Sequence, residues 1–106
     1  MELTRAYIKR LLPVRDPEGH KGTFGKVYCL CGAVGYTGAP VLAASAAVRS
    51  GSGLVFLGVP EDIWPIVAVK CDSAMPSPLP SQQGKLALAA EDAVRARIDV
   101  CDAVLI

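Results

Sequence analysis

The chain has 106 residues and a net charge of +1, which is room for one small domain or for part of a larger one. Hydrophobic residues make up 52% and charged residues 20%, a composition typical of globular proteins rather than disordered ones. The balance of charge argues against a nucleic-acid partner. No apolar run approaches the roughly 20 residues that a membrane helix needs. We therefore expect a cytoplasmic protein with no membrane or nucleic-acid partner.

The cysteines argue for a reducing compartment and against a zinc site. None of the four forms a C-x-x-C pair, and the sequence has a single histidine, His20. Cys29 and Cys31 stand two apart in an apolar run, so their side chains should project from the same face of a strand. Buried free thiols are the expected state, and an incidental disulfide is the alternative.

The first half of the chain predicts a helix, a strand, a helix and a strand. Glu2–Leu12 has apolar residues at helical spacing, with Thr4 as the N-cap and Pro13 ending the helix. Two apolar runs predict buried strands, a glycine-rich turn separates the first strand from a helix of small residues, and Gly51 caps that helix. The strands are Lys26–Cys31 and Leu54–Val59, the turn is Gly32–Gly38, and the helix is Ala39–Arg49.

The second half predicts two more helices and a last strand. Pro60–Asp62 has the residues of a helix start, and Pro65 should keep that helix short or irregular. Ser73–Gln83 is expected as a loop, with a short extended piece at most. Gly84–Ile98 predicts a helix and Ala103–Ile106 a third strand. This alternation is typical of a parallel α/β sheet flanked by helices in three layers. Three strands make a thin sheet, so we expect residues 1–106 to be the amino-terminal portion of a single, larger domain, or to be completed by a partner chain.

The segment between the first strand and the next helix is the strongest candidate for ligand binding. Glycines allow backbone N–H groups to approach a ligand, and a helix amino terminus adds unpaired donors and a positive dipole end. The spacing G-x-x-G-x-x-G is neither a P-loop nor the dinucleotide fingerprint, so a tight structural turn is the alternative. The candidate residues are Gly32, Gly35, Tyr36, Thr37, Gly38, Ala39 and Pro40.

A second candidate segment lies before the first strand and comprises His20, Lys21 and Gly22. His20 could carry a proton or donate a hydrogen bond, and Lys21 could contact a phosphate. The alternative is a structural loop in which Gly22 and Gly25 shape the turn into the strand. Spacing alone leaves both open.

Taken together, the motifs of His20–Glu61 resemble the start of the ADP/ATP-dependent NAD(P)H-hydrate dehydratases. The matches are Arg15 with His-Lys-Gly-x-x-Gly (20–25), Gly32 with Tyr-Thr-Gly-Ala-Pro (36–40), Arg-Ser-Gly-x-Gly-Leu-Val (49–55), Val-Pro-Glu (59–61) and the closing run 102–106. Two positions depart from the family pattern, because Cys31 replaces a usual glycine and Ala33 a usual serine.

The resemblance implies a ribokinase-like fold and a role in metabolite repair. Such enzymes use ADP or ATP, with Mg²⁺ expected, to phosphorylate and then dehydrate NADHX or NADPHX, which restores NADH or NADPH. The resemblance also implies that the turn Thr37–Pro40 lies on the hydrate's side of the site and that His20–Gly22 supports this site from nearby. The family's catalytic segments have no counterpart here, so we expect no catalytic residue in this chain and no activity from it alone. Alternatives are another ribokinase-like small-molecule kinase, or a non-catalytic module that binds a nucleotide or oligomerises. We also expect a homo-oligomer.

Overall fold

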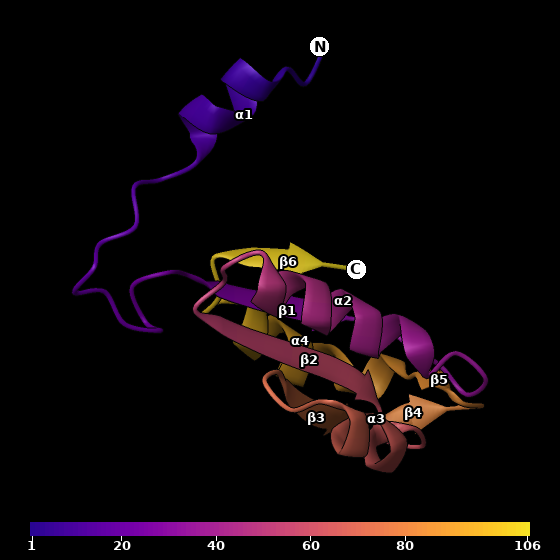
Figure 1. The fold of residues 1–106 in the computed structure, drawn as a ribbon. Helices are drawn as coiled ribbons and strands as arrows, with labels where there is room; N and C mark the ends of the chain where they lie inside the picture. The colour runs from indigo at the N-terminus through magenta and orange to yellow at the C-terminus, as the bar shows by residue number, and fades with distance from the viewer.

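A computed structural model describes all residues, 1–106, and its centre is a four-stranded parallel sheet in the order β3-β2-β1-β6 (Figure 1). The strands of this sheet are β1 Lys26–Leu30, β2 Leu54–Pro60, β3 Met75–Leu79 and β6 Ala103–Leu105. A separate hairpin pairs β4 Ser81–Gln82 with β5 Lys85–Leu86. The helices are α1 Arg5–Leu11, α2 Gly38–Arg49, α3 Trp64–Lys70, the short 3-10 helix Leu88–Ala90 and α4 Glu91–Ile98.

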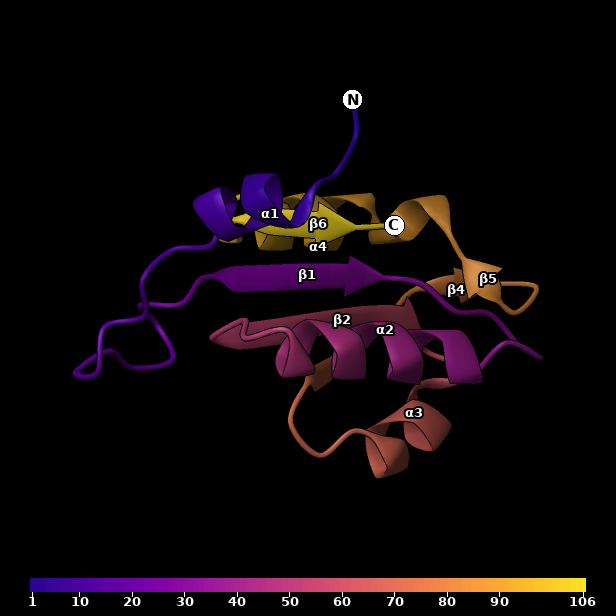
Figure 2. The ribbon, with the colours of Figure 1, turned by 45° about the horizontal axis from the view of Figure 1, so that its top comes forward.

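Helices cover both faces of the sheet, which confirms the predicted three-layer α/β/α class. Figure 2 shows α2 and α3 on one face, with α4 on the other side of the strands. On the α4 face, the guanidinium of Arg97 lies 4.3 Å from the ring centroid of Phe56. The connections from β1 through α2 to β2, and from β2 through α3 to β3, join parallel neighbours, as short crossovers do.

The core lies between β1, β2 and the two helices α2 and α3. Its fully buried members are Cys29, Ala44, Val55, Leu57, Val59, Ile63 and Val67. Cys31 packs against the same cluster, which confirms that Cys29 and Cys31 face the same way. All four cysteines are free thiols, although only Cys29 is buried completely. Tyr28, the neighbour of Cys29, is buried on the opposite face, so β1 is covered on both sides as its apolar sequence predicts.

The segment Ser73–Gln83 does contain a short extended piece, but the sequence does not predict that this piece is a fourth strand of the main sheet. β3 pairs with β2 in parallel from Phe56↔Met75 to Pro60↔Leu79. Pro76 and Pro78 obscure this strand in the sequence. Proline has no N–H to donate to a neighbouring strand. Both prolines are tolerated because β3 is an edge strand, in which every second N–H would face away from the sheet and pair with no strand.

Two predicted helix starts are wrong. Pro60 is the last residue of β2, and α3 begins at Trp64, with Pro65 in the first turn where a missing N–H costs nothing. The final helix begins at Glu91 rather than Gly84, because Gly84 adopts a positive φ of 74° and Lys85–Leu86 pairs with β4.

The other predicted elements are confirmed with small shifts at their ends. Thr4 caps α1 by accepting a hydrogen bond from the Tyr7 N–H at 3.2 Å. Gly51 follows α2 with a φ of 104°, the left-handed conformation expected of a C-terminal cap. The helix α1 buries no residue and projects away from the sheet in Figure 1.

Candidate functional site

The glycine-rich loop, defined as residues 31–40, leaves the carboxyl end of β1 and runs into α2. Gly32 and Gly35 have positive φ values of 99° and 85°. At Gly32 a side chain is excluded sterically as well, since a Cβ there would lie 2.9 Å from Ile63 Cδ1 and 3.0 Å from Pro40 Cγ. Glycine is therefore favoured at both positions by its backbone conformation, and at Gly32 the neighbouring Pro40 and Ile63 also leave no room for a side chain.

The loop presents a series of unpartnered backbone donors. Three of its N–H groups have protein acceptors: Tyr36 donates to the Ala33 carbonyl within the loop at 2.9 Å, Cys31 donates to the Gly58 carbonyl at 3.3 Å, and Val34 donates to the Gly84 carbonyl at 2.8 Å. The N–H groups of Gly35, Thr37, Gly38 and Ala39 donate to no protein acceptor. Unpaired donors at a helix amino terminus suit an anionic or strongly polar ligand.

Two side chains of the loop are available to a ligand. The hydroxyl of Thr37 makes no capping hydrogen bond to α2, although Thr37 occupies the N-cap position. The Tyr36 side chain is 72% exposed. Pro40 is buried and has no N–H, so it shapes the loop from below instead of donating to a ligand.

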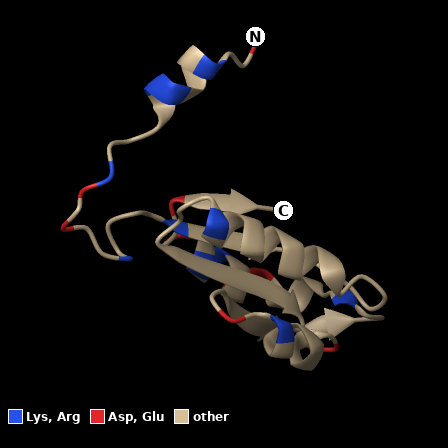
Figure 3. Cartoon of the chain, viewed as in Figure 1, with Lys and Arg blue, Asp and Glu red and all other residues tan.

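The glycine-rich loop itself carries no charged side chain. The chain has no charged residue from Val27 to Val48, and the corresponding ribbon is tan in Figure 3. The nearest acidic side chains by connection follow β2, where Glu61 and Asp62 are both hydrogen-bonded to Ser81. A ligand at the loop would therefore meet neutral hydrogen-bond donors and the positive end of α2.

The second predicted segment lies at the other end of β1. His20–Gly22 comes before β1 and the glycine-rich loop comes after it, so the strand separates the two (Figure 1). His20 Nδ1 accepts from the Gly22 N–H at 3.1 Å, and the His20 carbonyl accepts from the Thr23 N–H at 2.8 Å. In this structure the segment shapes the entrance to β1 and does not adjoin the loop, contrary to the expectation of a nearby support.

Residues that were not expected to contact one another surround this entrance. The carbonyl of Lys21 lies directly over Gly53, and the Gly53 N–H donates to the Gly25 carbonyl at 3.0 Å. Arg15 stacks its guanidinium 3.9 Å from the Phe24 ring centroid and donates to the Gly51 carbonyl at 3.0 Å. We call this group, Arg15 with residues 20–25 and 51–53, the amino-end clasp. The clasp thus brings together two motifs that are far apart in the sequence.

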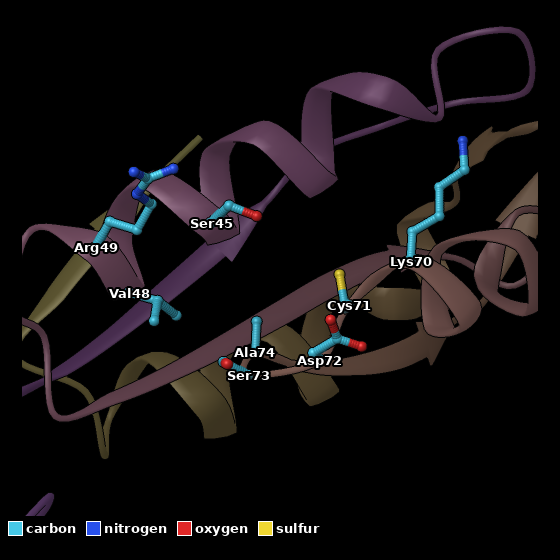
Figure 4. Close-up of a pocket in the computed structure, with 8 residues that line it drawn as sticks. All are labelled: Ser45, Val48, Arg49, Lys70, Cys71, Asp72, Ser73 and Ala74. Carbon is cyan, nitrogen blue, oxygen red and sulfur yellow. The ribbon is translucent and has the colours of Figure 1, made fainter.

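None of the three cavities of the chain is lined by the glycine-rich loop. One of about 240 Å³ lies between the carboxyl ends of α2 and α3, and its lining includes Arg49, Lys70 and Cys71. In Figure 4 the charged ends of Arg49 and Lys70 do not point toward each other. Burial and the neighbouring Asp72 raise the pKa of the Cys71 thiol, which keeps it protonated. This cavity therefore lacks a converging anion site and a reactive thiolate.

No three His, Cys, Asp or Glu side chains gather into a group that could hold a metal ion by themselves. None of the helices is both long and apolar enough to span a bilayer.

Comparison with known proteins identifies the family. The family model for NAD(P)H-hydrate dehydratase matches residues 27–104, which run from within β1 to within β6. The chain belongs to the NAD(P)H-hydrate dehydratase family. Among curated relatives, the bifunctional NAD(P)H-hydrate repair enzyme of Moorella thermoacetica is 39% identical over 98% of this chain. The ADP-dependent (S)-NAD(P)H-hydrate dehydratase of Bacillus subtilis is 39% identical over 60% of it.

This member of the family spans only a small share of its relatives. It covers 20% of the Moorella protein and 23% of the Bacillus one. Among solved structures, the Bacillus subtilis ADP/ATP-dependent NAD(P)H-hydrate dehydratase, co-crystallised with ATP and Mg²⁺, has a TM-score of 0.62 at 35% identity, over 71% of this chain and 27% of that one. A ribokinase-like superfamily protein from Enterococcus faecalis has a TM-score of 0.74 at 20% identity, over 98% of this chain and 34% of its own, which shows the ribokinase-like fold.

Proposed function

We propose that this chain contributes the hydrate-binding wall of an enzyme that dehydrates NADHX or NADPHX at the expense of ADP or ATP. The observation that carries the proposal is the row of free N–H groups at Gly35, Thr37, Gly38 and Ala39, on a loop that belongs to this family. Membership alone would be compatible with a degenerate domain. The unpartnered N–H groups and the free Thr37 hydroxyl make no hydrogen bond that would stabilise the fold. They are therefore free to bind a ligand.

The chain's residues would bind and orient the hydrate. Gly38 and Ala39 N–H groups face outward from the first turn of α2 and can receive an oxygen of the ligand, while the Thr37 hydroxyl adds a donor and acceptor on a rotatable bond. Holding a ligand so that a hydroxyl meets a phosphoryl donor supplies much of the acceleration in such a transfer. We assign no catalytic residue to this chain.

We further propose that residues 1–106 form the amino-terminal portion of a single domain. β6 is an edge strand whose residues Val104 and Leu105 are 39% and 49% exposed. An apolar groove of about 440 Å³ opens beside it on the α4 face, between Leu30, Leu88 and Ile98. Unpaired edges and open apolar grooves are usually covered in stable α/β domains. The small share of each relative that the chain spans supports the same proposal.

A side-by-side turnover assay tests the proposed function. Chain 1–106 and the longer product of the same reading frame would each receive NADHX with ADP and then with ATP, while the absorbance of reduced nicotinamide is followed. We expect the longer form to restore this absorbance with ADP or with ATP, and chain 1–106 to restore none. Silence from a folded longer form with both nucleotides would overturn the proposal and favour another ribokinase-like kinase.

Assembly into a homo-oligomer is also a prediction. Sedimentation at several concentrations checks it, since a monomer at all concentrations would contradict it.

A further inference from the structure

The hairpin of β4 and β5 touches two of the connections that follow strands of the main sheet. Its tip lies on the glycine-rich loop, where the Gly84 carbonyl accepts from the Val34 N–H at 2.8 Å. Its base lies on the β2–α3 connection, where the Ser81 hydroxyl donates to the Asp62 carboxylate and the Ser81 N–H donates to the Glu61 carboxylate at 3.4 Å. The hairpin therefore joins the loop after β1 to the connection after β2.

The contact at the tip leaves no room for a side chain. Gly84 has a φ of 74°, and a Cβ built there would lie 2.8 Å from both Cβ and Cγ2 of Val34. Gln83, next to it, also has a positive φ, 52°. Position 84 thus requires glycine for its backbone conformation and for its close approach to Val34.

We propose that this hairpin is a brace for the candidate site, with Gly84 as the positioning residue that fixes the glycine-rich loop. The inference rests on the proposed function, since it concerns the loop that we assign to the hydrate. The bond to Gly84 takes the Val34 N–H away from any ligand. The next residue, Gly35, carries a free N–H, and those of Thr37, Gly38 and Ala39 follow, so a displaced hairpin tip would move these donors together with Val34.

Amide hydrogen exchange of the chain without ligand tests the brace. Gly84→Ala introduces a clash at Val34, and we expect the Val34 amide to exchange at least tenfold faster while the Leu57 amide in β2 keeps its protection. Gln83→Gly is the matched control, since it changes the same turn without touching Val34 and should leave that amide protected. An unchanged Val34 amide in a folded Gly84→Ala chain would overturn the inference.

Two further variants keep the test decisive. Adding Val34→Gly to Gly84→Ala removes the two clashing atoms, Val34 Cβ and Cγ2, so the amide at position 34 should regain part of its protection. The strain of alanine at a positive φ remains, and general destabilisation would give no recovery. If Gly84→Ala does not fold, Ser81→Ala loosens the base instead and should speed exchange at Val34 about threefold. No change there would also overturn the brace.

The outcome is separable from that of the proposed function. If Gly84→Ala speeds Val34 exchange but the wild-type chain and its longer form neither bind nor convert NADHX, the brace stands and the proposed function fails. If NADHX is converted but neither Gly84→Ala nor Ser81→Ala changes the exchange rate of the Val34 amide, the brace is wrong and the proposed function stands.

Discussion

The backbone of Lys21 rests directly on Gly53, so that a Cβ built at Gly53 would overlap the Lys21 carbonyl oxygen. This contact joins the segment before β1 to the segment before β2, at the end of the sheet opposite the glycine-rich loop. The motifs that resemble the family thus serve two purposes. One set closes the amino end of the sheet, and the other shapes the glycine-rich loop at its carboxyl end.

Gly53→Ala should therefore unfold or severely weaken the chain. The added methyl group meets backbone atoms, which cannot rotate away, and overpacking of this kind costs about 3 kcal/mol. Chemical denaturation measures the loss. Gly38→Ala is the control, because a Cβ at Gly38 meets open space, and it should change the free energy of unfolding by less than about 0.5 kcal/mol. Equal effects of the two substitutions would contradict the clasp.

Arg15 should stabilise the clasp through its shape as well as its charge. Its guanidinium stacks on Phe24 and donates to the Gly51 carbonyl. We expect Arg15→Ala to lower the free energy of unfolding by about 1 kcal/mol, and Arg15→Lys to recover only part of it, since an ammonium cannot stack as a planar guanidinium does. Thermal unfolding of the three proteins checks this order. Full recovery with lysine would show that charge alone matters.

Asp102 should anchor the start of β6 to the start of β1. Its Oδ2 accepts a hydrogen bond from the Lys26 N–H at 2.7 Å, a short, charge-assisted bond. Asp102→Ala should lower the free energy of unfolding by about 1–2 kcal/mol. Asp99→Ala, which removes a carboxylate from the same turn without breaking a side-chain hydrogen bond, should have little effect. Denaturant titration distinguishes them, and similar losses would refute the anchor.

The stability of the chain should fall at alkaline pH. Burial raises the pKa of the Cys29 thiol above its ordinary value of 9.0, and burial together with Cys29 does the same for Cys31. Burial also raises the pKa of Tyr28 above 10.0. Since the folded chain holds these protons more tightly than the unfolded chain, their contribution is complete below pH 9 and is lost as the pH rises through the folded values.

Denaturant titration between about pH 7 and pH 10.5 measures this dependence. The free energy of unfolding should stay flat up to about pH 8.5 and then decline. Cys31→Ala should decline less steeply, because it removes one of the titrating groups. Stability that rises above pH 9 would contradict the assignment.

The sequence predicts best those elements whose apolar pattern is uninterrupted. Lys26–Cys31 and Leu54–Val59 are strands in the structure because their buried residues face helices on both sides. β3 escapes prediction since its prolines are typical of loops, and only pairing with β2 reveals that an edge position tolerates them. Tertiary contact overrides local preference in the same way at Gly84–Leu86, where pairing with β4 replaces the first turn of a helix.

The site is predicted in part for a similar reason. Glycine spacing and the following helix identify the loop after β1, because its conformation depends on nearby residues. The Val34–Gly84 bond joins residues fifty positions apart, and no local pattern in the sequence signals it. His20 lies far from the loop because the two flank opposite ends of β1, and the motifs in the sequence do not reveal this separation.

The most direct test of the central claim is residue-resolved amide exchange of this chain, with and without NADHX. We predict slower exchange at Gly35, Thr37, Gly38 and Ala39 when the hydrate is bound, with no change at Thr23 in the amino-end clasp. A chain that carries Thr37→Val should show weaker protection at the same amides. Protection confined to the clasp, or none on the loop at saturating hydrate, would contradict it.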